Sequence, residues 1–288
     1  MGAESDLIFG LATAFGYGSG DFVARQTARR IGHLQVLFYM EVASLALLVP
    51  AAVLFDSGQW HWTPMWGYAA GLAVLNVVAS LFLYRSFEYG VLSVVSPVVS
   101  TFPAVTAILA FVFLPEQPTP LEVAGIVAAL AGVVLISRAQ AHPDNPPAKD
   151  ARKGLVSAVL CFLGYGVFYF ALKFVVADLG VLTTAAYVRV VGVAAIAVAM
   201  LAGIAHVHRV PRAFVPSLVV VGVLDSAAFL TYNVGITLGS VAVVGTLSGL
   251  FSAVTVGLAA LILRERLVRI QYAGLAAIFL GIVLLALA

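Results

Sequence analysis

Long apolar runs separated by short polar stretches dominate the pattern along this chain. A transmembrane helix needs about 20 mainly apolar residues in a row, and ten runs of about that length can be marked. They cover residues 7–25, 33–55, 64–86, 91–114, 120–138, 153–173, 181–205, 213–235, 240–263 and 268–287. The runs are continuously apolar and do not alternate, which excludes a transmembrane β-barrel. The pattern predicts an all-α membrane protein with ten transmembrane helices.

The composition agrees with a chain that lies almost wholly in the membrane. Of its 288 residues, 62% are hydrophobic and 10% are charged, whereas soluble domains contain about 25% charged residues. Residues 1–6 are acidic and lack the basic region of a signal peptide, so we expect the first segment to remain in the mature protein. The single cysteine, Cys161, excludes an intramolecular disulfide.

The second half of the chain repeats the first. Residues 90–136 return at 239–285 with a shift of 149 and no gap, and a shift of 148 aligns the beginnings of the two halves. A polar, proline-rich linker at 139–152 separates repeat 1 (1–138) from repeat 2 (153–288). Because five helices is an odd number, the second copy must cross the membrane in the opposite direction. The sequence therefore predicts two inverted five-helix repeats, an architecture of many secondary transporters.

The loop charges give an independent prediction of topology. The odd-numbered loops and their flanks hold nearly all basic residues, whereas the other side holds Lys173 alone. The positive-inside rule then places the odd loops in the cytoplasm and both termini outside. We expect a multi-pass protein of the inner (plasma) membrane.

Ionisable residues inside the apolar segments are few, and each costs at least about 2.5–3.5 kcal/mol near the bilayer centre. The candidates for a functional role are Asp21, Glu41, Arg189 and Asp225. Residues of this kind usually face a cavity or a partner. Asp21 precedes Arg25 by four residues, so pairing on one helix face is the alternative to a functional role.

The repeat relates these residues to one another. Glu41 aligns with Arg189 at the 148 shift, and Asn76 aligns with Asp225 at the 149 shift. Glu41 and Arg189 each lie about 12 Å into their helix from opposite membrane faces, so they would differ in depth by about 6 Å in a core about 30 Å thick. They are predicted to form a structural ion pair or to share a substrate.

Polar and aromatic side chains at helical spacing predict a lined cavity between the repeats. The candidate substrate-binding residues are Tyr17, Asp21, Tyr39, Glu41, Asn76, Ser80, Tyr165, Tyr187, Arg189, Asp225, Tyr232 and Ser248. Pro97 and Pro103 in the fourth segment, and Gly245 and Gly249 in the ninth, are positions where helices can break, as they do at binding sites of inverted-repeat carriers. The alternative for the serines is a bond to a carbonyl of their own helix.

Other patterns predict packing rather than chemistry. Ala124, Ala128 and Gly132, with their copies Ala273, Ala277 and Gly281, form small-residue faces typical of helix packing. His206 and His208 lie at a loop end without further ligands, so no metal site and no cofactor are expected.

The whole chain resembles the drug/metabolite transporter superfamily, in its ten-helix branch of EamA-type transporters. The resemblance rests on the end of each repeat, where Leu114-x-Glu116, Ala124-Gly125 and Gly132-Val133-Val134-Leu135 return as Leu263-x-Glu265, Ala273-Gly274 and Gly281-Ile282-Val283-Leu284, and on the first helix, Gly16-Tyr17-Gly18-Ser19-Gly20-Asp21-Phe22. It implies a carrier whose members often have an arginine in the second helix of each repeat. Arg189 matches this pattern and Glu41 departs from it. The family's cargo is diverse, so the resemblance names no substrate.

Together these features predict a secondary transporter, as an exporter, of a small polar or amphipathic metabolite such as an amino acid. Alternating access would occur around a midplane cavity, with the fifth and tenth segments as packing helices. A carboxylate among Asp21, Glu41 and Asp225 is the candidate carrier of a coupling proton. The expected partners are the substrate, the lipid bilayer and protons, with no nucleic acid, and the chain is expected as a monomer or homodimer.

The sequence also bears on three other classes of membrane protein. The chain has no ATP-binding loop, so ATP-driven transport would need a separate subunit. A membrane-embedded enzyme would need a dense carboxylate or histidine cluster at one interface, and because none is visible we expect no enzymatic activity. A lipid-linked substrate flippase, or an accessory subunit of a lipid-modifying complex, remains the alternative, since it could use the same fold.

Overall fold

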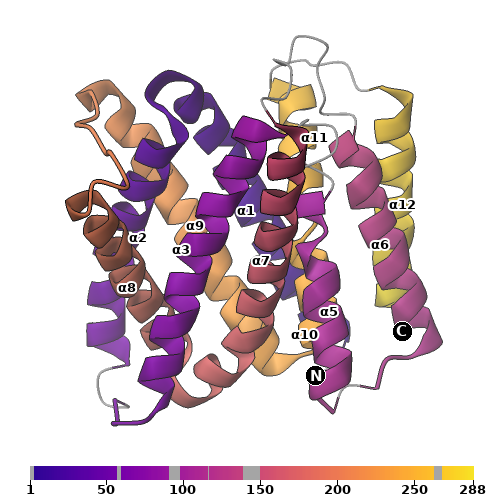
Figure 1. Cartoon of the computed structure of the whole chain (residues 1–288). Coiled ribbons are helices and arrows are strands. Elements are labelled where there is room, and N and C mark those ends of the chain that lie inside the picture. The colour runs from indigo at the N-terminus through magenta and orange to yellow at the C-terminus, as the bar shows by residue number, and fades with distance from the viewer. Residues whose placement is uncertain (1–2, 57–59, 91–97, 116, 139–149, 263–267) are drawn as a thin grey trace.

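The computed structural model describes residues 3–56, 60–90, 98–115, 117–138, 150–262 and 268–288. Within these ranges the chain is a bundle of helices (Figure 1). Repeat 1 contributes α1 (Ala3–Ile31), α2 (His33–Phe55), α3 (Met65–Tyr89), α5 (Phe102–Phe113) and α6 (Pro120–Arg138). Repeat 2 contributes α7 (Ala151–Leu179), α8 (Val181–Leu201), the short 3₁₀ helix η2 (Arg212–Phe214), α9 (Val215–Leu238), α10 (Val241–Ser248), α11 (Phe251–Ile262) and α12 (Arg269–Ala286).

The helices are long and apolar enough to cross a membrane. In the described part of the chain nine spans meet this criterion, α10 and α11 counting as one, and a shorter apolar helix covers Val98–Phe113. The fourth predicted segment begins at residue 91, but residues 91–97 lie outside the described ranges, and with them Pro97. The chain is a multi-pass membrane protein.

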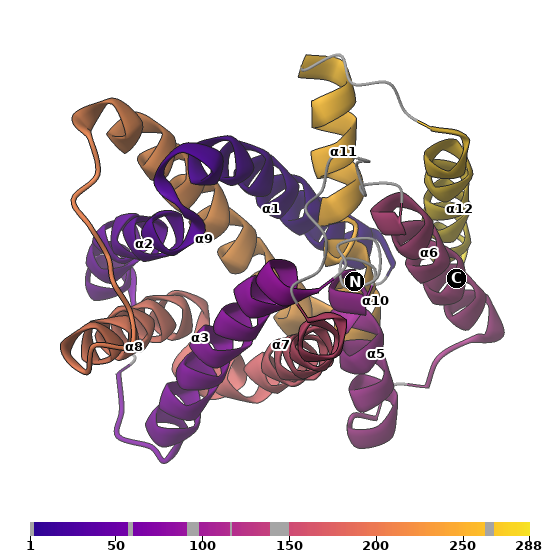
Figure 2. The same ribbon diagram turned by 45° about the horizontal axis from the view of Figure 1, so that its top comes forward.

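Helices from the two repeats pair along the bundle (Figure 2). α6 packs against α12 on one side, α2 lies beside α8 on the other, and α1, α3, α7 and α9 lie between them. α1 packs on α9 and α7 packs on α3, so each first helix contacts the third helix of the other repeat. The core of the bundle is thus built from contacts between the repeats.

The α6–α12 pair is built on small residues in close contact. A methyl group added to Gly132 would lie 2.6 Å from the carbonyl oxygen of Gly274, and one added to Gly125 would lie 3.0 Å from that of Gly281. Gly125 thus meets the later glycine of α12 and Gly132 the earlier one. The two helices therefore run antiparallel, as inverted repeats require.

The predicted small-residue faces lie only partly in this contact. Gly132 and Gly281 are in it, whereas Ala124 and Ala273 are both exposed. The contact face contains Gly125, Ala129 and Gly132 of α6 and Gly274 and Gly281 of α12. Both registers contain small residues at nearly helical spacing, so the sequence pattern alone does not distinguish them.

Equivalent side chains make equivalent bonds in the two repeats. The Thr106 hydroxyl donates to the carbonyl of Gly166 at 3.1 Å, and the Thr255 hydroxyl donates to that of Gly18 at 3.0 Å. The turn between the first two helices of each repeat has a glycine with positive φ, 89° at Gly32 and 83° at Gly180. L-residues with a Cβ rarely adopt this conformation, so glycine is required at both.

The ninth predicted segment is broken, as its glycines suggested. α10 ends at Ser248 and α11 begins at Phe251, with Gly249 between them. A side chain at Gly249 would collide with Pro103 of α5. The break therefore lets the fourth helices of the two repeats approach closely.

Candidate functional site

Three charged side chains from three helices meet inside the bundle. Arg189 of α8 donates through Nη1 to Oε1 of Glu41 on α2 at 2.6 Å, and through Nη2 to Oδ2 of Asp225 on α9 at 2.5 Å. We call these residues the charged triad. The side chains are 6%, 4% and 15% exposed for Arg189, Glu41 and Asp225. The triad lies at the interface of the repeats, since Glu41 alone comes from repeat 1.

Small residues let the three helices approach. Gly222, one turn before Asp225, packs against α2, where an added methyl group would lie 3.1 Å from the carbonyl oxygen of Met40. Ser44 of α2 donates a hydrogen bond to the carbonyl of Gly222 at 3.1 Å. On α8, Gly192 leaves room beside Oε2 of Glu41. The close contact of α2 with α9 thus fixes the distance between the two carboxylates.

The triad is only partly satisfied. Oε2 of Glu41 and Nε of Arg189 are buried without a hydrogen-bond partner among the described residues. With both carboxylates ionised the triad carries one net negative charge, and removing charged groups from water is costly even when they are paired. The arrangement can therefore accept one cationic group or one proton. Oε2 of Glu41 and Nε of Arg189 remain available for hydrogen bonds to polar groups.

Aromatic side chains form one wall of the site. The guanidinium of Arg189 lies over the Phe229 ring at 5.0 Å, and Phe229 stacks on Phe168 at 6.2 Å. Tyr169 contacts Phe168 at 5.1 Å and Tyr17 at 6.5 Å, edge to face in each case. Contacts of a cation with an aromatic face are attractive and become stronger away from water.

Several predicted residues do lie around the triad or its aromatic wall. The Tyr17 ring packs edge to face on Tyr169 of the aromatic wall. The Tyr165 hydroxyl is 2.9 Å from the Ser80 hydroxyl, which in turn donates to the backbone carbonyl of Asn76 at 2.8 Å. Asn76 itself is half-buried on α3.

Other predicted residues make contacts of a structural kind. The Tyr39 hydroxyl bonds to the carbonyl of His208 at 3.2 Å, and the Tyr187 ring packs on Trp66 at 4.8 Å. The Ser248 hydroxyl bonds to the carbonyl of Gly245 in its own helix at 2.8 Å.

The remaining two predicted residues differ in burial. Tyr232 is fully buried and donates to the carbonyl of Tyr169 at 3.0 Å. Asp21 is exposed on α1.

The sequence missed two features of the site. Glu41 and Arg189 were aligned as candidate partners, but nothing in the repeat pointed to Asp225 as the second partner of Arg189. Phe168 was not identified from the sequence, whereas Tyr169 lies one helical turn after the candidate Tyr165, on the face expected to line a cavity. Phe229 stood four residues after Asp225, on the same helical face.

Some sequence features lie outside the described residues. These are Pro97, Glu116, Leu263 and Glu265. The linker 139–152 is described only from Asp150 onward.

Comparison with known proteins identifies the family. The model of the EamA-like transporter family matches residues 5–138 and again 152–287. An uncharacterized protein of Methanocaldococcus jannaschii is 32% identical over 137 residues, which are 46% of this chain and 97% of that protein. That relative therefore has about the length of a single repeat.

A solved crystal structure has the same fold. It superimposes with a TM-score of 0.81 over 98% of this chain and 96% of that one, at 17% sequence identity. Such a low identity speaks for the fold alone. The two family matches cover almost the whole sequence, and the chain belongs to the EamA-like transporter family of membrane transporters.

Proposed function

We propose that this protein is a secondary transporter that exports a small zwitterionic metabolite, such as an amino acid, by alternating access. The charged triad is the observation that carries this proposal. It places one cation and two anions, incompletely hydrogen-bonded, at the contact between the repeats. Buried charges within membrane helices are costly and usually serve a substrate or ion pathway.

The charges suit a zwitterion. A substrate carboxylate would pair with Arg189, whose guanidinium offers a planar fork to carboxylates. That exchange would release Glu41 or Asp225 to accept the substrate amino group. The aromatic wall at Phe229 would hold the apolar part of the metabolite.

A proton is the proposed coupling ion. Because the triad has two carboxylates and one guanidinium, one carboxylate can take a proton without leaving Arg189 unpaired. Protonation of Glu41 or Asp225 would weaken its bond to Arg189 and favour binding of the substrate carboxylate.

Liposome transport tests the role of the triad. Purified protein in liposomes is expected to take up radiolabelled amino acids, and Arg189→Ala to reduce uptake to that of protein-free liposomes. Arg212→Ala removes an exposed arginine that is not part of the charged triad. It is the matched control and should leave uptake unchanged. Uptake that persists in Arg189→Ala would exclude the zwitterion mechanism.

A neutral triad separates a transport role from a structural one. Glu41→Gln, Arg189→Gln and Asp225→Asn together remove the charges while keeping polar side chains of similar size. We expect this variant to remain folded and monodisperse but to be inactive. Full transport by it would show that the triad is only an ion pair. Wild-type transport that is indifferent to an imposed pH gradient would argue against proton coupling.

The alternative, a flippase for lipid-linked substrates, is favoured by one observation. A cavity of about 730 Å³ opens between α3 and α7 and is lined almost entirely by apolar groups, among them Tyr68, Leu72, Leu75 and Phe174. Such a lateral opening could admit an acyl chain. Leu72→Ala would widen this cavity. Flipping of a fluorescent lipid by this variant in liposomes tests the flippase function separately from amino acid uptake.

The proposed topology places the linker and the other odd-numbered loops in the cytoplasm of the inner (plasma) membrane. Figure 1 shows both chain ends at the opposite end of the bundle from the end of α6 and the beginning of α7. Single cysteines introduced at Gly203 and Ser5, in a Cys161→Ala background, would be labelled from opposite sides of the membrane. Gly203 follows α8 and Ser5 begins α1.

A further inference from the structure

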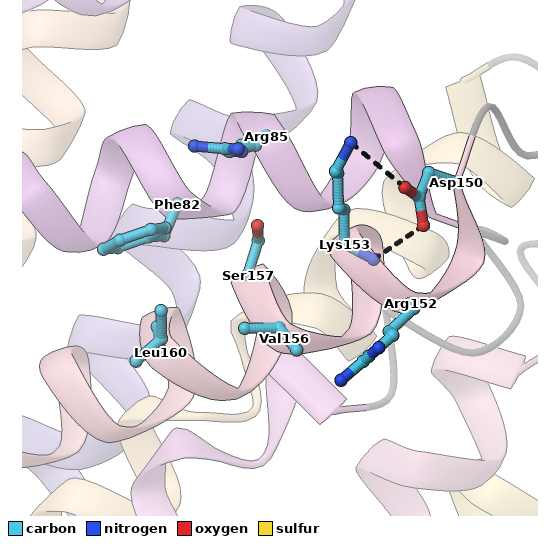
Figure 3. A pocket seen from close by; sticks show the side chains of 8 residues that line it. All are labelled: Phe82, Arg85, Asp150, Arg152, Lys153, Val156, Ser157 and Leu160. Carbon is cyan, nitrogen blue, oxygen red and sulfur yellow. Dashed lines mark hydrogen bonds and ion pairs between the residues drawn. The ribbon is translucent and has the colours of Figure 1, made fainter.

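A second cavity lies at the end of the bundle where α3 ends and α7 begins (Figure 3). It has a volume of about 410 Å³. Its lining contains three basic side chains, Arg85 of α3 and Arg152 and Lys153 of α7, and is largely apolar elsewhere. Phe82, Val156 and Leu160 form the apolar side, and Val156 and Leu160 are also exposed on the outer surface of the bundle.

Several polar groups in this cavity have no hydrogen-bond or ion-pair partner among the residues that the structure describes. The Ser157 side chain lines the cavity, is 3% exposed and makes no hydrogen bond to another described residue. Neither Arg85 nor Arg152 has a carboxylate within salt-bridge distance among the residues that the structure describes. Asp150 is the one acid in the lining, and it lies 3.3 Å from Lys153. The cavity therefore keeps a net positive charge.

The equivalent position in the other repeat is built differently. The repeat shifts align Arg85 with Val234, Arg152 with Glu4 and Lys153 with Ser5. They also align Ser157 with Phe9, and Phe9 fills the space beside Gly235, where an added methyl group would lie 2.8 Å from its Cβ. The fold alone therefore does not produce a basic cavity at this position.

We propose that this cavity binds the phosphate headgroup of an anionic phospholipid. The phosphate would lie between Arg85 and Lys153, accept a hydrogen bond from Ser157, and leave one acyl chain along Phe82, Val156 and Leu160. Basic pockets between transmembrane helices at the cytoplasmic surface bind anionic headgroups in this way. A free phosphate is also an anion but gains nothing from the apolar side. The site is separate from the charged triad and does not depend on the proposed transport function.

Native mass spectrometry of the full-length protein in detergent tests this site with phosphatidylglycerol as the probe. We expect one phosphatidylglycerol to remain bound more tightly than phosphatidylcholine of the same chain length. Arg85→Gln and Lys153→Gln should each weaken phosphatidylglycerol binding by about fivefold, the usual effect of one basic residue near a membrane surface. Ser157→Ala, which changes no charge, should weaken it by a similar factor of about five.

A charge-matched control separates the site from general attraction. Arg209→Gln with Arg212→Gln removes two exposed basic residues away from the cavity. This variant should bind phosphatidylglycerol as the wild type does. Equal loss in the control and in Arg85→Gln with Lys153→Gln would show attraction to net charge only and overturn the proposal.

The same measurement distinguishes lipid from soluble phosphate. Inorganic phosphate at millimolar concentration should not displace phosphatidylglycerol. If it does, or if Ser157→Ala and Leu160→Ala leave lipid binding unchanged, the cavity is a phosphate site or no site, and the lipid assignment is wrong.

Discussion

The two repeats share their backbone contacts but differ in the side chains of the interior. Thr106 and Thr255 bond equivalent carbonyls, and Gly32 and Gly180 make equivalent turns. Yet Glu41 in one repeat stands where Arg189 stands in the other. Equivalent positions in the two repeats therefore have opposite charges, and these two residues form an ion pair with each other.

This difference separates two tasks of the molecule. In the proposed alternating access, equivalent contacts would allow the two repeats to exchange environments. A symmetric site would offer the same charge from both repeats, whereas this site offers opposite charges and can orient a zwitterion. Motion would thus depend on what the repeats share, and recognition on what they do not.

The largest expected effect comes from moving the asymmetry itself. Glu41→Arg places two arginines together, and Arg189→Glu places three carboxylates together. Each should cost at least about 3 kcal/mol, the range found when a buried ion pair is broken. The measurement is the apparent melting temperature in detergent, with size-exclusion profiles to follow folding.

Combining the changes should restore stability step by step. The exchange Glu41→Arg with Arg189→Glu restores one pair but leaves Asp225 beside a carboxylate. Adding Asp225→Asn and Asn76→Asp completes the mirror image of the triad in repeat 1. A fourfold variant no more stable than the single variants would show that the surroundings of Asn76 and Asp225 are not equivalent.

The next effect tests a contact that the repeats share. Gly132→Ala and Gly274→Ala each place a methyl group within 3 Å of the opposite helix. Overpacking of this kind costs about 1–3 kcal/mol, and the two variants should lower the melting temperature equally. Unequal losses would show that α6 and α12 do not pack symmetrically.

Gly71→Ala is the control for the glycine variants. An added methyl group there has no atom within 4 Å, and alanine favours a helix over glycine by about 0.8–1.0 kcal/mol. We therefore expect Gly71→Ala to be neutral or stabilising. If Gly71→Ala lowers the melting temperature as much as Gly132→Ala does, the loss in Gly132→Ala does not come from contact with the opposite helix.

A smaller effect is expected from the two threonines. Thr106→Val and Thr255→Val each remove one hydrogen bond between helices and should each cost about 1 kcal/mol. Thr27→Val is the control, because its hydroxyl bonds to Val23 within its own helix. The comparison between the repeats fails if one of the two threonine variants behaves like this control while the other does not.

The sequence predicted most of the fold because its strongest signals are long and local. Apolar runs locate helices, and the repeat shows equivalent positions whatever the structure. The register of the α6–α12 contact could not be predicted in this way. Ala124 and Gly125 are neighbours of similar size, and only contact with α12 decides which of them is buried.

The sequence identified the three residues of the charged triad, but not all of the contacts between them. Buried ionisable residues are rare in membrane helices, so Glu41, Arg189 and Asp225 stood out without a structure. The bond from Arg189 to Asp225 depends on how closely α9 approaches α2, which Gly222 and Ser44 determine. Such an approach is a property of three dimensions and leaves little trace in spacing.

The smallest effect concerns the start of α7, which has no described counterpart in repeat 1. Asp150 caps α7 by accepting a hydrogen bond from the backbone N–H of Lys153 at 3.0 Å. This bond lowers the pKa of Asp150 below its ordinary value of 3.8. Because the pKa is depressed in the folded state, the cap stabilises the protein above pH 3.8 and is lost as the pH falls below it.

Asp150→Asn measures this contribution, since asparagine caps a helix without titrating. The melting temperature of the wild type should fall slightly more than that of Asp150→Asn between pH 6 and about pH 3. The Asp150 side chain is 34% exposed, so solvent screens the effect and the difference should be small. Arg152→Gln, with the cap intact, should follow the wild-type pH profile. If the wild type instead becomes more stable than Asp150→Asn at low pH, the direction of the pKa shift is wrong. The capping role of Asp150, whose backbone N–H also donates to the carbonyl of Tyr89, is then wrong as well.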